Sequence, residues 1–139
     1  YDGTLKSVER DLDHLIKNAP SEISNMARII KLGVTDRNIS NELMEISKNK
    51  DYDIVLRDLS VLLLVSRTMD KMDANESIKM LEEISFGDHP FTLSAQELIG
   101  VIALKANNME RAKAAFDTIL ADKNAPKSML NRIKLLNLK

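Results

Sequence analysis

The two histidines are the residues whose chemistry could most directly make this chain an enzyme. A histidine acts as a general base when it lies beside a nucleophile and is oriented by a third group. His14 falls on the polar side of a predicted helix and His89 lies in a turn before Pro90, and no serine or carboxylate spacing ties either of them to a nucleophile. We therefore interpret both histidines as structural.

Carboxylates and glycines offer other chemistry. The neighbouring pairs Glu82/Glu83 and Asp51/Asp53 could act as paired carboxylates, but adjacent acids on a helix face or loop end usually serve solvation and capping. The four glycines form neither of the glycine-rich runs that cradle phosphates, and the absence of cysteine excludes thiol catalysis, thiolate metal sites and disulfides. The sequence predicts a protein that is not an enzyme and uses no metal or cofactor.

The composition narrows the class of protein and the kinds of partner that are expected. The chain has 139 residues, 44% hydrophobic and 29% charged, which is typical of one globular domain. Its net charge of -1 creates no overall field that favours nucleic acid or an anionic membrane, and its few aromatics do not interleave with basic residues. The longest apolar run, residues 59–65, is far below the roughly 20 residues that a membrane helix needs. Because the chain opens at Tyr1 without a signal-peptide pattern, we interpret it as a fragment of a longer protein.

The elements that must position any site are helices. Apolar residues recur at intervals of three and four, and prolines and glycines are few. We expect the helix over residues 53–71 to be central, because it is apolar nearly all round. Gly33 should end the second helix, Thr35 or Asp36 should cap the third, and Asp73 should cap the fifth. The predicted helices include about 4–18, 21–32 and 53–71, a third helix that presents Ile39, Leu43 and Ile46, and a fifth that presents Ile78, Leu81 and Ile84. Two further helices lie in residues 97–120, divided at Asn107–Asn108, and a last helix starts at Pro126.

Three times along the chain, a small residue on one predicted helix is followed, at similar spacing, by two residues on the next helix. The first of these two is small or apolar, and the second is a large apolar residue. Two antiparallel helices joined by a short turn approach closely, so a small residue is needed where the backbones come nearest. A large apolar residue on the return helix then fills the space beside it. The three predicted repeat-packing sets are Ala27, Ile39 and Leu43; Ser66, Ser77 and Leu81; and Gly100, Ala112 and Phe116.

These residues resemble the tetratricopeptide repeat, which has small residues at the first two positions, an aromatic at the third and a closing proline. Gln96 and Ala103 depart from the pattern, since they stand where the family favours Trp and Tyr. The resemblance implies an all-α fold, a tetratricopeptide-like right-handed superhelix (α-solenoid) of antiparallel helix pairs. It implies one domain over 1–139, with a half repeat at 1–19, repeats at 20–50, 53–86 and 90–124, and a capping helix at 126–139.

A narrower resemblance rests on three stretches of the second half. The segments "RDLSVLLLVSRTMD", "SIKMLEEI" and "HPFTLSAQELIGVIALKANNMERAKAAFDTILAD" are similar to the periplasmic domain of the ancillary Sec translocon subunit family of proteobacteria. Members of that family are anchored by one N-terminal membrane helix and are thought to assist newly exported proteins and their chaperones. The resemblance implies a domain at the periplasmic face of the inner membrane, with translocon subunits or envelope chaperones as partners.

The first helices of successive tetratricopeptide repeats line a concave groove, which is the surface that solenoids use for binding. We expect Arg28 and Arg67 to meet acidic side chains or a terminal carboxylate of another protein, while Leu63 and Val101 supply apolar contact. The alternative is that these are ordinary solvated charges. The predicted partner-binding residues are Ser24, Arg28, Lys31, Leu63, Arg67, Lys71, Glu97, Val101 and Lys105.

The C-terminal segment, residues 127–139, has four basic and no acidic residues in an amphipathic pattern. It could lie on a membrane surface, but a helix that caps the repeats explains it more simply. The repeat pattern predicts a non-catalytic protein-interaction scaffold. The resemblance to the ancillary Sec translocon subunits implies the soluble domain of a membrane-tethered envelope protein that assists protein export or chaperone recruitment. A free cytosolic tetratricopeptide adaptor and a regulatory or accessory domain of an enzyme are the alternatives.

Overall fold

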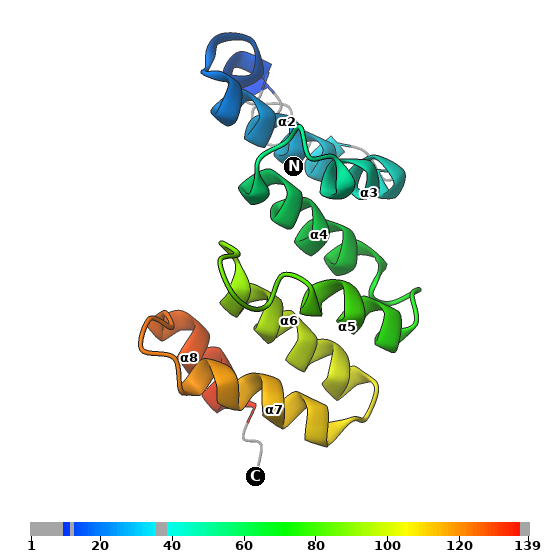
Figure 1. Ribbon diagram of the computed structural model, residues 1–139, viewed down its shortest axis with the longest axis vertical. Helices are drawn as coiled ribbons and strands as arrows, with labels where there is room; N and C mark the ends of the chain where they lie inside the picture. The colour runs from blue at the N-terminus through cyan, green and yellow to red at the C-terminus, as the bar shows by residue number, and fades with distance from the viewer. Residues whose placement is uncertain (1–9, 12, 36–38, 137–139) are drawn as a thin grey trace. The chain divides into compact units, whose positions relative to one another are not determined.

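The computed structural model describes residues 10–11, 13–35 and 39–136 (Figure 1). All regular secondary structure in these ranges is helical, which confirms the predicted all-α class. The chain divides into two compact units, residues 1–64 and residues 65–139. The division falls inside one helix and inside the predicted repeat at 53–86.

In the first unit, the described residues 10–11 and 13–18 are helical, and two short helices and most of a third follow. These are α2 (Ser21–Thr35), α3 (Ser40–Lys48) and α4 (Ile54–Thr68), of which α4 continues into the second unit. The hydroxyl of Ser24 donates to the carbonyl oxygen of Ile16 at 2.7 Å and joins α2 to the helix before it. The start of α4 is capped by Asp53, whose carboxylate accepts from the N–H of Leu56 at 3.1 Å.

The predicted boundary between α2 and α3 is wrong. Gly33 and Thr35 both lie inside α2, and Asp36 lies outside the described residues. A glycine within a helix costs about 1 kcal/mol relative to alanine but does not by itself end the helix, which here continues for two more residues. The residue at the start of α3 is Ile39, which is buried and makes no side-chain capping bond.

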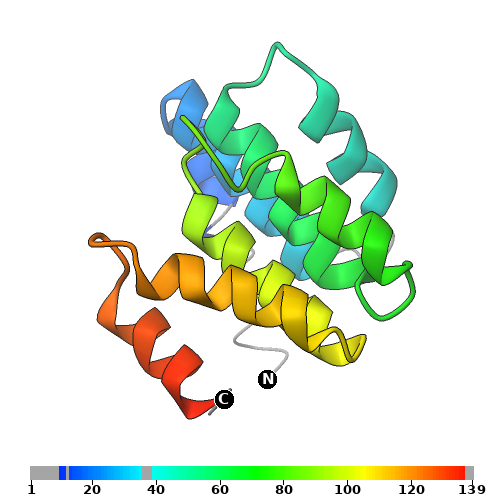
Figure 2. The ribbon, with the colours of Figure 1, turned by 60° about the horizontal axis from the view of Figure 1, so that its bottom comes forward.

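The second unit contains the end of α4 and four further helices, α5 (Ala74–Glu82), α6 (Thr92–Lys105), α7 (Met109–Leu120) and α8 (Lys127–Leu135). Helix α6 packs against both α5 and α7, and α8 packs against α7 (Figures 1 and 2). The predicted cap at Asp73 is confirmed, because its carboxylate accepts from the N–H of Glu76 at 3.3 Å. Pro126 precedes α8, as predicted.

The predicted break at Asn107–Asn108 is also confirmed. Asn107 has a φ of 60°, a left-handed conformation that asparagine tolerates better than most residues. The side chain of Asn108 accepts a hydrogen bond from the N–H of Arg111 at 3.0 Å and caps α7. The two residues therefore end α6 and start α7 within one tight turn.

The packing of α6 on α7 depends on one glycine. A Cβ atom placed on Gly100 would lie 2.5 Å from two ring carbons of Phe116, which is too close for any side chain. The Phe116 ring is itself buried, so it occupies the space that the missing side chain leaves. Of the predicted repeat-packing residues, Ser66 is exposed, and the other eight are buried: Ala27, Ile39, Leu43, Ser77, Leu81, Gly100, Ala112 and Phe116.

Candidate functional site

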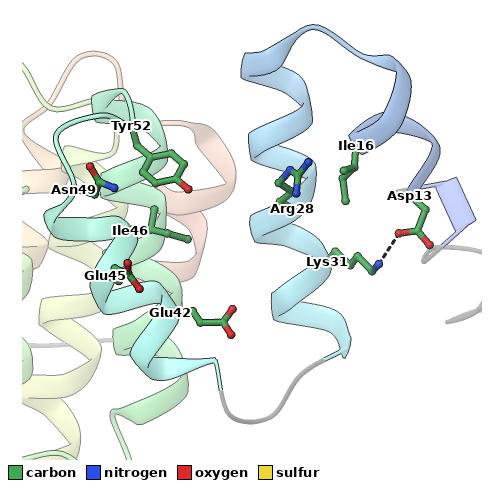
Figure 3. A pocket seen from close by; sticks show the side chains of 9 residues that line it. All are labelled: Asp13, Ile16, Arg28, Lys31, Glu42, Glu45, Ile46, Asn49 and Tyr52. Atoms are coloured by element: carbon green, nitrogen blue, oxygen red, sulfur yellow. Dashed lines mark hydrogen bonds and ion pairs between the residues drawn. The ribbon is translucent and has the colours of Figure 1, made fainter.

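A pocket of about 520 Å³ opens on the first unit, between the helix that precedes α2, α2 itself and the α3 region (Figure 3). Its walls combine charged, amide, aromatic and branched aliphatic side chains. The lining residues are Asp13, Ile16, Arg28, Lys31, Glu42, Glu45, Ile46, Asn49 and Tyr52.

Helix α2 contributes the cations. Arg28 and Lys31 lie three residues apart and so share one side of the helix, while Ala27 and Ile29 are buried. The ammonium of Lys31 forms an ion pair with the carboxylate of Asp13, drawn as a dashed line in Figure 3. Both side chains are more than one third exposed, so this pair contributes little to stability.

Helix α3 contributes the acids on its solvent side. Glu42 and Glu45 are exposed and lie one turn apart, and Leu43 between them is buried. The chain then turns at Asn49, whose carbonyl oxygen accepts from the N–H of Tyr52 at 3.2 Å. This turn brings the phenol ring of Tyr52 back toward the pocket, and Figure 3 shows Glu42 and Tyr52 pointing to the α2 side.

The remaining hydrogen bonds around this turn fix its backbone. The side chain of Asn49 accepts from the N–H of Asp51 at 2.9 Å, and Arg57 donates to the carbonyl oxygen of Tyr52 at 3.1 Å. The Tyr52 side chain is half-buried. The pocket wall formed by Asn49 and Tyr52 is therefore held by hydrogen bonds within residues 49–57.

The other predicted partner-binding residues do not line this pocket. Ser24 is buried, and its hydroxyl donates to the carbonyl oxygen of Ile16. Leu63 is half-buried in α4. In the second unit, Arg67 and Lys71 are exposed and Val101 is half-buried.

The last two predicted residues take part in ion pairs within the second unit. Glu97 on α6 accepts from Arg132 on α8, with the closest nitrogen and oxygen 3.0 Å apart. Lys105 lies 3.2 Å from the carboxylate of Asp70, beside a smaller pocket of about 240 Å³. Both pairs join a helix to a neighbouring segment, so these charges have a structural use.

Three of the residues considered for catalysis have structural partners of their own. His14 is exposed, and its Nδ1 lies 3.2 Å from the side-chain amide of Asn18. Glu82 forms an ion pair with Arg111 at 3.3 Å, and Asp53 caps α4. Among the described residues, no group of three or more acidic or histidine side chains could hold a metal ion.

Sequence reasoning found Arg28 and Lys31 but missed the residues that face them. Glu42, Glu45 and Asn49 follow the helical spacing of three and four, opposite the buried residues Ile39 and Leu43. That polar stripe was a usable signal. Which second helix it would face depended on tertiary structure, which the spacing within α3 does not contain.

Comparisons of the chain with protein-family models, with curated proteins and with solved structures find no match. Within the part of the chain that the structure describes, none of the helices has the length and apolar character needed to cross a membrane.

Proposed function

We propose that this chain is a non-catalytic protein-interaction module that holds a segment of another polypeptide. Its helix pairs form a tetratricopeptide-like right-handed superhelix, and the pocket of the first unit is one of its binding sites. The observation that carries the proposal is the pocket itself. At about 520 Å³ it falls within the range of ligand sites, roughly 300–1,000 Å³.

The lining of the pocket supports a polypeptide as the ligand. Ile16 and Ile46 offer apolar surface, Tyr52 offers an aromatic ring with a hydroxyl, and Arg28 offers a fork of hydrogen-bond donors. Tyrosine and arginine are enriched where proteins bind one another, because each combines a large contact area with polar groups. A side chain and its neighbouring backbone could satisfy such a mixed surface.

We also propose, from the resemblance to the ancillary Sec translocon subunits, that the domain works at the periplasmic face of a bacterial inner membrane. Translocon subunits or envelope chaperones are then its partners, and the full protein carries a membrane anchor. An upstream apolar stretch of roughly 20 residues in the gene would support this anchor. Upstream sequence without such a stretch would favour a free adaptor.

The test is affinity capture from a solubilised envelope membrane extract, with quantitative mass spectrometry of the retained proteins. The test variant replaces Arg28 and Arg67 by glutamate. The matched control replaces Lys113 and Lys123 by glutamate. Both lysines are exposed and are not among the predicted partner-binding residues, and the change in net charge is the same as in the test variant.

We expect translocon subunits or envelope chaperones to be retained in equal amounts by the wild type and the control, and in a different amount by the test variant, because the reversal at Arg28 changes the charge of the pocket wall. Equal retention by all three proteins would contradict a role for these arginines. Retention of cytosolic proteins alone would contradict the envelope assignment.

A further inference from the structure

The charges that line the pocket of the first unit are unequal. Three carboxylates, those of Asp13, Glu42 and Glu45, face two cations, those of Arg28 and Lys31. The ion pair between Lys31 and Asp13 occupies one charge of each sign. Two carboxylates on α3 therefore remain against one guanidinium on α2, and the α3 side of the pocket has an excess of negative charge.

The two glutamates are placed to receive a cation. They lie three residues apart on α3, so their carboxylates project from the same side of the helix. Both are exposed, and within the described part of the chain neither side chain forms an ion pair or hydrogen bond. Figure 3 shows Glu42 reaching from α3 toward the α2 side of the pocket.

Aromatic and apolar groups border these carboxylates. The ring of Tyr52 lines the same wall, and a cation over an aromatic face gains attraction from the ring quadrupole. Ile46, on α3, and Ile16, on the helix before α2, provide apolar surface in the same pocket. A long basic side chain matches this combination, since its methylene groups can lie on apolar surface while its charge meets a carboxylate.

We propose that the pocket binds a partner segment in which a lysine or arginine is flanked by an apolar residue. The basic group lies against Glu42 and Glu45, and the apolar neighbour contacts Ile16 and Ile46. This inference rests on the proposed function and names the class of its partner. It reverses the sequence-based expectation that Arg28 selects an acidic segment, because the two acids opposite Arg28 outnumber it.

The exposure of the glutamates decides between a polypeptide and a free amine. Ion pairs between exposed groups are weak, because water and salt screen them and ordering the side chains costs entropy. A single ammonium ion would therefore bind poorly. A polypeptide segment adds apolar and backbone contacts to each ion pair, so the observed lining suits it better.

Fluorescence anisotropy with three labelled peptides tests the inference directly. The peptides have equal length and alternate leucine with lysine, with glutamate or with glutamine. The protein variants are Glu42→Gln/Glu45→Gln in the pocket and Glu83→Gln/Asp117→Asn as the control. The control removes two negative charges from exposed positions outside the pocket, so it measures nonspecific attraction of a basic peptide. Circular dichroism of each variant verifies its helical content.

We expect the lysine peptide to bind the wild type more tightly than the glutamine or glutamate peptide does. The pocket variant should weaken this binding about 5- to 30-fold, since two exposed ion pairs are lost, while the control stays within about twofold. Raising the salt concentration should weaken the binding to the wild type and control. A second variant, Glu42→Lys/Glu45→Lys, should transfer the preference to the glutamate peptide.

Two results would overturn the inference while leaving the proposed function intact. One is tighter binding of the glutamate peptide to the wild type, with loss in Arg28→Gln, which would make the partner acidic. The other is pocket-dependent binding of all three peptides with equal affinity. If instead the control weakens binding as much as the pocket variant does, or if no peptide binds, both the inference and the peptide-binding role of the pocket fail.

Discussion

The helix pair α6–α7 and the region of α2 and α3 share the same spacing of predicted repeat-packing residues. The two regions differ in the residues next to these positions. In the first, Gly100 and Phe116 bring the helices into close contact, and both residues are buried. In the second, the corresponding Ala27 and Leu43 are buried too, yet the residues beside them line an open pocket.

The difference lies in the neighbours of the shared positions. Ala27 is followed by the exposed Arg28, and Leu43 is preceded by the exposed Glu42. Gly100 has the buried Ile99 before it and the half-buried Val101 after it. Both regions thus bury their small and large residues, while the residues one position away are largely covered in α6 and carry exposed charges in α2 and α3.

The largest effect should come from breaking the closed pair at its aromatic residue. Phe116→Ala is expected to lower the free energy of unfolding by about 3–5 kcal/mol, because a buried ring is lost and a cavity remains. Phe86→Ala is the matched control, since Phe86 is 61% exposed and its loss should cost less than about 0.5 kcal/mol. Urea unfolding followed by circular dichroism measures both. Similar losses for the two variants would show that α7 is not packed on α6 through this ring.

Gly100→Ala tests the same contact from the other helix. Alanine favours a helix over glycine by about 1 kcal/mol, but its methyl group would enter the space of the Phe116 ring. We expect a net loss of about 1–3 kcal/mol in the free energy of unfolding, typical of an overpacked core.

The double variant Gly100→Ala/Phe116→Leu separates overpacking from other causes. The smaller leucine leaves room for the new methyl group. The loss of unfolding free energy in the double variant should therefore be smaller than the sum of the losses in Gly100→Ala and Phe116→Leu, by more than about 0.5 kcal/mol. Strict additivity in urea unfolding would contradict a direct contact between positions 100 and 116.

The sequence predicted the fold best where local chemistry was sufficient. The helical class follows from hydrophobic periodicity, the cap at Asp73 from a side chain that bonds to a nearby N–H group, and the break at Asn107–Asn108 from turn-forming residues. Gly33 was misread as the end of α2, because glycine permits a helix end without requiring one. Ser66 has the right size and spacing but is exposed, since spacing alone does not specify which side of a helix is covered.

Two of the residues that line the pocket were among the predicted partner-binding residues. Arg28 and Lys31 follow from their places beside Ala27 on α2, and both line the pocket. Predicting that Glu42 and Glu45 line the same pocket requires knowledge of how α3 lies relative to α2. That placement depends on contacts between helices. A binding surface formed by two helices is for this reason harder to read from one sequence than a cap or a turn.

The α6–α7 pair and the α2–α3 region also differ in helix capping, and the expected effect on the free energy of unfolding is smaller. The N-cap residue of α7 is Asn108, whose side chain accepts a hydrogen bond from the N–H of Arg111, whereas the N-cap residue of α3 is Ile39, which makes no side-chain capping bond. Asn108→Ala should lower the free energy of unfolding by about 1 kcal/mol through the lost hydrogen bond. Asn131→Ala, at an exposed position of α8, should change it by less than about 0.5 kcal/mol. Thermal unfolding of both variants distinguishes a cap from a generic loss of an amide.

The smallest effect on stability should come from the acids of the open pocket. Glu42→Gln/Glu45→Gln is expected to change the free energy of unfolding by less than about 0.5 kcal/mol. Two small terms oppose each other: like charges one turn apart repel, while Glu42 in the first turn of α3 interacts favourably with the helix dipole. Neither carboxylate has an ion-pair partner among the described residues that the change would leave alone. Urea unfolding tests this, and a loss above about 1 kcal/mol would mean that the acids hold α3 in place. A stability close to that of the wild type would leave ligand binding as the property that these two side chains control.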